Sequence, residues 1–200
     1  MADDRLAFTN EGVYMTEEQY LALDASSDAK YERIDGIVTM LRPASSAYGG
    51  DADILDMAGG SLAHAALCLS IGALIKPQLR GSGCMAYSSD GPMKMVQGNY
   101  SYPDITVACG ETRLPSTPTV IIEVLSPATE KRDRDAKFKA YKKLPSLQEY
   151  VLVGSEYRAI EVHRREGNFW RQFHYLPSDL VELTSIGVSF PFDDVYEDIL

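Results

Sequence analysis

The chain contains little cysteine, and its cysteines form no metal-binding motif. There are three of them, an odd number, at Cys68, Cys84 and Cys109. These spacings are long and include no C-x-x-C pair, which argues against a zinc site of the usual kinds. A free cysteine packs as a small hydrophobic residue, so we expect all three to be buried free thiols.

A secretory signal and a membrane-spanning segment are also lacking. The N-terminal stretch MADDRLAF is acidic and has no apolar core, unlike a signal peptide. The longest apolar stretch, residues 62–75, includes His64 and is followed by Lys76 and Pro77. It is too short to cross a bilayer. We therefore expect a cytoplasmic protein with no membrane partner.

Several widespread catalytic motifs are missing. The sequence has no G-x-x-x-x-G-K-[ST], G-x-G-x-x-G, G-x-S-x-G or H-E-x-x-H, and this argues against P-loop enzymes, dinucleotide-binding folds, serine hydrolases of the elbow type and zinc proteases. No organic cofactor site is expected. The chain also lacks an excess of positive charge: its net charge is −10, which argues against non-specific coating of nucleic acid.

The remaining composition is that of a globular protein. Two hundred residues, 45% of them hydrophobic and 24% charged, suit one domain with a real core. We expect a single domain over residues 1–200, with a flexible lead-in at 1–15 and a mobile glycine-rich loop at 43–60.

Periodicity predicts an alternation of helices and strands. Thr16 with Gln19 resembles a capping box, and Asp35-Gly36 predicts a tight turn between two strands. Helices are expected at 16–24, 61–79 and 131–144. The second is apolar on nearly every face, so we expect the rest of the fold to bury it. Strands are expected within 31–41 and at 84–88, 93–96, 105–109, 120–125, 149–153, 160–165, 169–176, 181–183 and 188–190. Their order predicts a mixed α/β or α+β fold with the sheet inside.

An acid inside the most apolar strand is the main anomaly. Glu123 lies within VIIEVL, and Asp104 directly precedes the apolar strand ITVAC. Neighbouring strands lie about 4.8 Å apart, so two paired strands would bring both acids to one cation. Asp133, Lys137 and Tyr141 share a helical stripe. A salt bridge to a helix lysine, or a surface pair of Asp133 with Lys137, is the structural alternative.

These residues resemble the PD-(D/E)XK nuclease superfamily, and more closely its bacterial Uma-type restriction endonuclease branch. The segments that carry the resemblance run across most of the chain: MTEEQYLAL, YERIDG at 31–36, YPDITV at 102–107, IIEVLSPATEKRDRDAKFKAYKKLPSLQEYVLV at 121–153 and FPFDDVYEDI. The resemblance implies a restriction-endonuclease-like mixed β-sheet flanked by helices, here with an additional C-terminal β-hairpin. It also implies Mg²⁺- or Mn²⁺-dependent hydrolysis of phosphodiester bonds.

The resemblance assigns a catalytic set. Asp104 and Glu123, with the backbone carbonyl of Val124, would bind the metal. The usual pattern has a lysine two residues after the second acid, where this chain has Leu125. Lys137 on the next helix takes that role in our interpretation, and Lys131, in the loop before that helix, is the less favoured substitute.

Other residues would support this site. Glu32 matches an acidic position and is a further candidate metal ligand, whereas a strand-edge charge is its structural alternative. His64 shares a stripe with Cys68 and Ile71, and a satisfied core histidine is its alternative. Asp90 and Tyr141 are further second-layer candidates. Arg134, Lys139 and Lys142 would contact the DNA backbone, although a solvated helix face is the plainer reading of that basic segment. His163 and His174 read as exposed strand residues.

The sequence thus predicts a metal-dependent DNA endonuclease, and by analogy a homodimer. One alternative is an inactive nuclease-fold protein that acts in binding or assembly, which the acidic net charge favours. Another is a nuclease for RNA or branched DNA.

Overall fold

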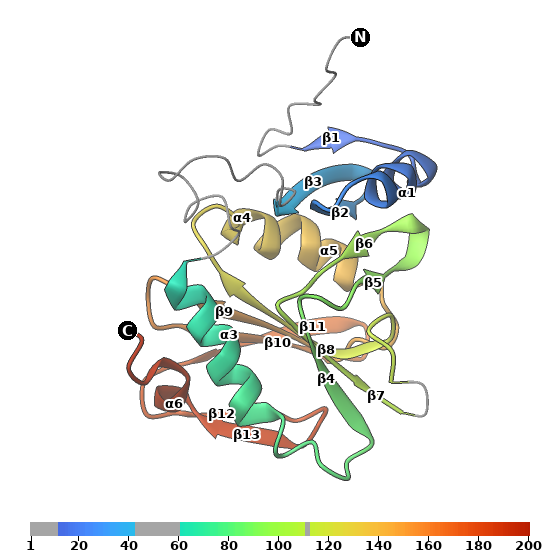
Figure 1. The fold of residues 1–200 in the computed structure, drawn as a ribbon. Helices are drawn as coiled ribbons and strands as arrows, with labels where there is room; N and C mark the ends of the chain where they lie inside the picture. Colours follow the sequence, from blue (N-terminus) through green and yellow to red (C-terminus); the bar gives the residue numbers. More distant parts are fainter. Residues whose placement is uncertain (1–11, 43–60, 111–112) are drawn as a thin grey trace.

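The computed structural model describes residues 12–42, 61–110 and 113–200. The larger of its sheets has six strands in the order β11-β10-β9-β8-β7-β4 (Figure 1). Only β8 and β9 pair in parallel, and the other neighbours are antiparallel. The strands are β4 (Cys84–Ser88), β7 (Ile105–Cys109), β8 (Pro118–Leu125), β9 (Glu149–Gly154), β10 (Ile160–Glu166) and β11 (Phe169–Tyr175). This is the predicted mixed sheet.

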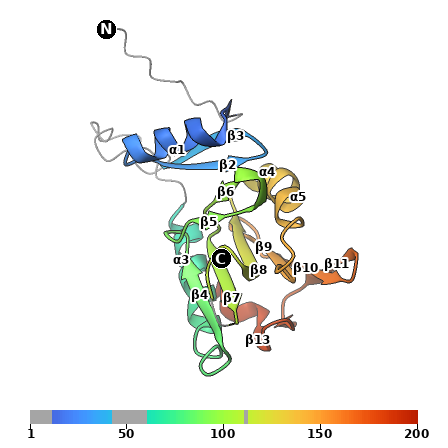
Figure 2. The same ribbon diagram turned by 90° about the vertical axis from the view of Figure 1, so that its right-hand side faces the viewer.

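A second sheet stands beside the N-terminal helix, with five strands in the order β1-β3-β2-β6-β5 (Figures 1 and 2). Its members are β1 (Val13–Tyr14), β2 (Lys30–Ile34), β3 (Ile37–Arg42), β5 (Met93–Lys94) and β6 (Tyr100–Ser101), and the short 3-10 turn η2 (Val96–Gly98) joins the last two. The turn between β2 and β3 is Asp35-Gly36, both with positive φ, as that pair predicts.

Helices cover both faces of the six-stranded sheet. The helix α3 (Leu62–Ile75) packs its Leu67, Ile71 and Ile75 against one face. A continuous helical segment made of α4 (Glu130–Arg132), a π-helical turn η3 (Asp133–Lys137) and α5 (Phe138–Tyr141) covers the other. Because β8 lies between these layers, nearly all of its residues are buried. The charged residue Glu123 is therefore enclosed within the core.

The C-terminal part adds the predicted hairpin. Strands β12 (Leu180–Leu183) and β13 (Val188–Pro191) form a two-stranded antiparallel sheet that packs into the core on the α3 side. The helix α6 (Phe192–Tyr196) follows and was not predicted. None of the helices in the described ranges is long and apolar enough to cross a membrane.

The N-terminal helix begins as its sequence predicts. Thr16 caps α1 (Glu17–Ser26), and its hydroxyl accepts from the amide of Gln19, whose side chain in turn accepts from the amide of Thr16. The expected flexible lead-in is wrong for its last part, because Val13 and Tyr14 pair with β3. Residues 1–11 and the predicted loop at 43–60 lie outside the described residues.

The central helix departs from its prediction in length and burial. It ends at Ile75 rather than near residue 79, since Pro77 has no backbone N–H with which to continue the helical hydrogen bonds. We expected it to be covered on all sides, but Leu62 and Leu69 are 81% and 75% exposed. The helix rests on one face of the sheet, so only one stripe of its apolar surface is covered.

Two of the three cysteines are not free thiols. Cys84 and Cys109 form a disulfide, and only Cys68 is free. The two bonded residues lie directly opposite one another on the antiparallel strands β4 and β7. The expectation of three free thiols was wrong because strand register, which sets this pairing, is not visible in cysteine spacing.

Candidate active site

The two predicted acids lie next to paired positions on two neighbouring strands. The pairing of β7 with β8 places Ile105 against Ile122; Asp104 directly precedes the first of these residues, and Glu123 directly follows the second. The amide of Val124 donates a 2.8 Å hydrogen bond to Asp104 Oδ2. The predicted pairing of the two strands is therefore correct.

Glu123 is held by the helical segment that covers its strand. Lys137 Nζ lies 3.1 Å from Glu123 Oε1, and the Tyr141 hydroxyl donates to the same oxygen at 2.9 Å. Lys137 also pairs with Asp133 at 2.9 Å. Both lysine and acid are almost fully buried, so this is not the weak surface pair of the structural alternative. The stripe of Asp133, Lys137 and Tyr141 faces the sheet, as its spacing predicts.

A further carboxylate joins this group from the smaller sheet. Glu32 on β2 is fully buried, lies 3.8 Å from Lys137 Nζ and forms an ion pair with Arg132. Ser101 on β6 donates to Glu32 at 3.0 Å and lies 2.6 Å from the Tyr141 hydroxyl. Glu32 is thus no strand-edge charge. It lies beside the Lys137–Glu123 pair.

Burial and like charge dominate the electrostatics of this group. Burial raises the pKa of Glu123; Lys137 acts in the opposite direction, and Asp133, Asp104 and Glu32 raise it further. Burial acts to lower the pKa of Lys137, but its carboxylate neighbours hold it well above its usual range. The lysine therefore stays charged amid several carboxylates. Burial and Glu123 raise the pKa of Tyr141, which keeps its hydroxyl a donor.

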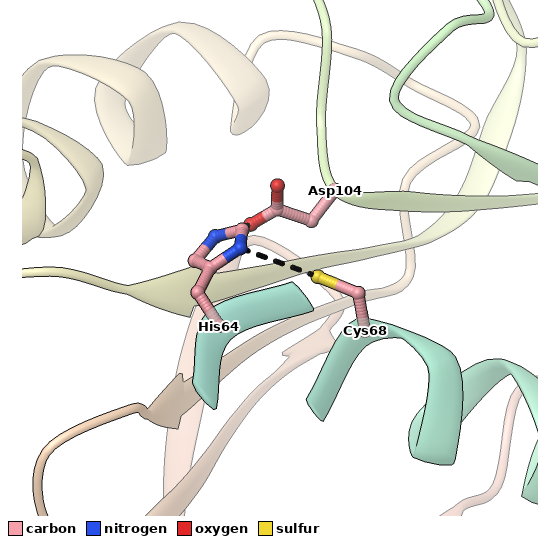
Figure 3. A group of neighbouring side chains, drawn as sticks. All are labelled: His64, Cys68 and Asp104. Atoms are coloured by element: carbon pink, nitrogen blue, oxygen red, sulfur yellow. Dashed lines mark hydrogen bonds and ion pairs between the residues drawn. The ribbon is translucent and has the colours of Figure 1, made fainter. Parts of the chain in front are cut away.

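Asp104 is bound from the other side of the sheet by α3. His64 Nε2 lies 3.2 Å from Asp104 Oδ2, and His64 Nδ1 lies 3.7 Å from the Cys68 sulfur (Figure 3). Burial acts to lower the pKa of His64, but its contacts with Asp104 and Cys68 outweigh this and raise it to about 10. The histidine is therefore a direct hydrogen-bonding partner of Asp104.

The remaining candidates lie further out. The Asp90 side chain is 84% exposed and pairs with Lys30 at 3.4 Å, and within the described part of the chain it forms no hydrogen bond or ion pair with Asp104 or Glu123. Lys131 belongs to α4 rather than to a loop, and it is exposed. It makes no recorded contact with the two acids among the described residues.

The three basic residues proposed for the DNA backbone differ from one another. Lys139 and Lys142 are exposed, and the amine of Lys142 stands 4.5 Å from the centre of the Phe138 ring. Arg134 is half-buried and pairs with Glu130 and Glu161 at 2.8 and 2.7 Å. Its guanidinium is therefore already bound, whereas the two lysines are open to solvent.

Two members of the charged group were not recognised in the sequence. Ser101 and Arg132 bind Glu32, but a serine and one of several clustered basic residues carry no distinctive pattern. His163 was expected to be exposed, yet it packs 4.5 Å from Phe138 and is largely covered. His174 is exposed as predicted.

Comparison with the sequences of known proteins shows which family the chain resembles. Residues 48–192 match the family described as "Uma2: Putative restriction endonuclease". The uncharacterized protein slr1290 of Synechocystis sp. is 33% identical over 189 residues, with 91% of each chain covered. A second uncharacterized Synechocystis protein, sll1609, is 25% identical over 162 residues, covering 77% of this chain and 82% of its own.

The fold has a counterpart among solved structures. A crystal structure described as a putative nuclease belonging to DUF820, from Anabaena variabilis, has a TM-score of 0.65 at 17% identity and covers 93% of this chain and 99% of its own. At this identity the likeness concerns the fold. From the match over residues 48–192, together with the 33% identity to the first Synechocystis protein, the chain belongs to the Uma2 family of putative restriction endonucleases.

Proposed function

We propose that this protein is a metal-dependent endonuclease that hydrolyses phosphodiester bonds of DNA with Mg²⁺ or Mn²⁺. One observation carries the proposal: Asp104, directly before β7, accepts a hydrogen bond from Val124 beside Glu123 on β8, and Lys137 is hydrogen-bonded to Glu123. Membership of a family described as restriction endonucleases supports the reaction class.

The residues fit a divalent cation. Mg²⁺ and Mn²⁺ prefer carboxylate and carbonyl oxygens. Glu123 uses Oε1 for Lys137 and Tyr141, and Asp104 uses Oδ2 for Val124 and His64. The other oxygen of each carboxylate accepts no hydrogen bond from the described part of the chain. Because neighbouring carboxylates raise the pKa of Glu123, a divalent cation would offset a crowded negative charge.

The backbone of Val124 offers a third ligand. Along a β-strand, the N–H and C=O of one residue point to the same neighbouring strand. The Val124 amide points to Asp104, so its carbonyl is directed to the same side. Asp104, Glu123 and the Val124 carbonyl would hold the cation together.

Each of these groups has a role in hydrolysis. The bound cation would polarise the scissile phosphate and lower the pKa of the attacking water. Lys137 orients that water and offsets negative charge that develops on the phosphate. Tyr141 and Lys137 together hold Glu123 in place. The exposed Lys139 and Lys142 contact backbone phosphates. Because Arg134 is already ion-paired, we assign the contacts with the DNA backbone to these two lysines.

We also propose that the active form is a homodimer, since cutting both strands of DNA needs two sites. Among the described residues, the edge strand β11 of the six-stranded sheet pairs with β10 alone, and Phe169 at its start and Leu176 just after its end are 57% and 65% exposed. Apolar side chains at an open sheet edge are typical of contacts between protein chains. Light scattering after size-exclusion chromatography tests this: a strictly monomeric protein would remove the dimer from the proposal.

The test combines cation binding with cleavage. Wild type, Asp104→Asn and Glu123→Gln are compared with Asp90→Asn, which changes an exposed acid outside the charged group. Mn²⁺ binding is measured by calorimetry without nucleic acid. Cutting is then measured on plasmid DNA, single-stranded RNA and a branched DNA. We expect wild type and Asp90→Asn to bind and to cut the plasmid, and the other two variants to lose both.

Two outcomes would redirect the proposal. Wild type that cuts no faster than Asp104→Asn and binds no Mn²⁺ at millimolar concentration would favour the inactive, binding or assembly protein. Preferential cutting of RNA or branched DNA would keep the reaction and replace the substrate.

A further inference from the structure

A second group of possible metal ligands consists of His64, Cys68 and Asp104. It combines nitrogen, sulfur and oxygen atoms, whereas the two acids offer oxygen alone. His64 and Cys68 stand four residues apart on α3 and so lie on the same side of the helix. Both side chains point toward Asp104 at the start of β7 (Figure 3). One ligand atom from each residue lies within 4.8 Å of the other two. The imidazole, thiol and carboxylate therefore converge on a small region.

The chemistry of this set favours a metal softer than magnesium. Zinc binds thiolate, imidazole and carboxylate, with bonds of about 2.0–2.3 Å. Tetrahedral bonds of that length place neighbouring ligand atoms roughly 3.3–3.5 Å apart. The Cys68 sulfur is 3.7 Å from His64 Nδ1, close to that spacing. Asp104 would have to approach by rotation of its side chain, which is partly exposed and at the end of a loop.

We propose that His64, Cys68 and Asp104 form a second cation site, selective for Zn²⁺ or a comparably thiophilic ion. Three protein ligands leave one tetrahedral position open to water. All three residues are only partly buried, so the ion has access from solvent. The thiolate distinguishes this site from the oxygen-only set, because Mg²⁺ has little affinity for sulfur.

The cysteine is available because the other two are bonded to each other. Cys84 and Cys109 form the disulfide between β4 and β7, and Cys68 is the free thiol of the chain. The sequence has no C-x-x-C motif that would indicate this site. It arises because the N-terminal part of α3 lies beside Asp104, 40 residues away from His64 in sequence.

The proposed sites share Asp104, and this predicts competition. Zn²⁺ on His64, Cys68 and Asp104 would withdraw that carboxylate from the Mg²⁺ set, so zinc would inhibit cleavage. This consequence rests on the proposed nuclease function. The zinc site itself does not, because it is detected without nucleic acid.

Cobalt is the spectroscopic probe for the experiment. Co²⁺ is added to the full chain without reductant, so that the disulfide stays closed. Wild type should bind one Co²⁺ with a thiolate-to-cobalt absorption band in the near ultraviolet and visible bands of tetrahedral intensity. Cys68→Ser should lose the near-ultraviolet band, and its Zn²⁺ affinity, measured by calorimetry, should fall by at least about tenfold. Circular dichroism establishes that the variant is folded.

A matched variant separates the two proposed sites. Glu123→Gln should keep zinc binding and lose Mn²⁺ binding, whereas Cys68→Ser should do the reverse. Zn²⁺ should also slow alkylation of Cys68 by iodoacetamide in wild type and in Glu123→Gln, and less so in His64→Ala. Identical cobalt spectra of wild type and Cys68→Ser, or loss of zinc binding in Glu123→Gln, would overturn the site. Absence of cleavage by wild type with intact zinc binding would count against the nuclease alone.

Discussion

The amine of Lys137 lies 3.1 Å from Glu123 Oε1 and 2.9 Å from Asp133 Oδ1 in the buried interior of the protein. One ammonium thus stands against several carboxylates, with Glu32 at 3.8 Å. The stability of each buried charge depends on the presence of the others, because a buried ion without a partner is strongly unfavourable. Several measurable consequences arise from this dependence.

Replacing Lys137 by methionine should destabilise the fold severely. The change leaves Glu123 and Asp133 buried without their cation, and breaking a buried pair on one side costs about 3–5 kcal/mol. Urea unfolding measures the loss. Lys139→Met, on the exposed side of the same helical segment, should change stability by less than about 0.5 kcal/mol. Adding Glu123→Gln to Lys137→Met should recover part of the loss, and equal stabilities of Lys137→Met and Lys139→Met would contradict the prediction.

Removing the Tyr141 hydroxyl should weaken the proposed cation site. Tyr141→Phe deletes the 2.9 Å hydrogen bond to Glu123, so we expect Mn²⁺ affinity and cleavage rate to fall by about tenfold to a hundredfold. Tyr196→Phe is the matched control, since it deletes a hydroxyl that bonds to the Ala159 carbonyl and amide at 2.7 and 3.0 Å, away from the acids. Both variants should lose about 1 kcal/mol of stability. Unchanged Mn²⁺ affinity in Tyr141→Phe would refute a supporting role for this hydroxyl.

The ion pair between Arg134 and Glu161 should make stability depend on acid pH. Burial acts to raise the pKa of Glu161, but the hydrogen bonds from Arg134 outweigh it and hold the pKa below its usual value of 4.5. A carboxyl whose pKa is lowered by folding stabilises the protein above that usual value and loses this contribution as the pH falls through the lower one. Glu161→Gln should therefore be less stable than wild type near neutral pH, and the difference should shrink in acid. Glu156→Gln, an exposed acid nearby, should show no such convergence, and a gap that stays constant in Glu161→Gln would disprove the linkage.

The disulfide between Cys84 and Cys109 should contribute to stability through the unfolded chain. It closes a loop with a sequence separation of 25 residues, for which loop-closure entropy predicts about 3.5 kcal/mol. Unfolding in urea with and without reductant measures this value. The Cys84→Ala and Cys109→Ala double variant should match reduced wild type and be insensitive to reductant. A double variant as stable as the oxidised protein would exclude the contribution.

Much of the fold follows from local patterns in the sequence. The capping box at Thr16 and the Asp35-Gly36 turn act within a few residues, and both form as expected. The apolar run VIIEVL becomes a central strand because its residues suit burial on both faces. Glu123 stands out within that run, which is why the acid could be selected without a structure.

Other features depend on contacts between distant segments. The π-helical turn at Asp133–Lys137 departs from the regular helix expected there, and such turns are frequent at functional sites. Ser101 reaches Glu32 across 69 residues of sequence. The disulfide and the burial of His163 likewise follow from register and packing. No periodicity within a short window contains this information.

The placement of Asp104 and Glu123 also bears on how the protein tolerates motion. Glu123 lies within β8, Asp104 directly precedes β7, and these two strands are hydrogen-bonded to each other, so the strand pairing limits changes in the gap between the main chains of the two acids. Thermal movement in the surrounding connections would leave that gap nearly constant. Sliding or fraying of β7 against β8 would change it at once, so amide hydrogen exchange at these two strands should report on the integrity of the site.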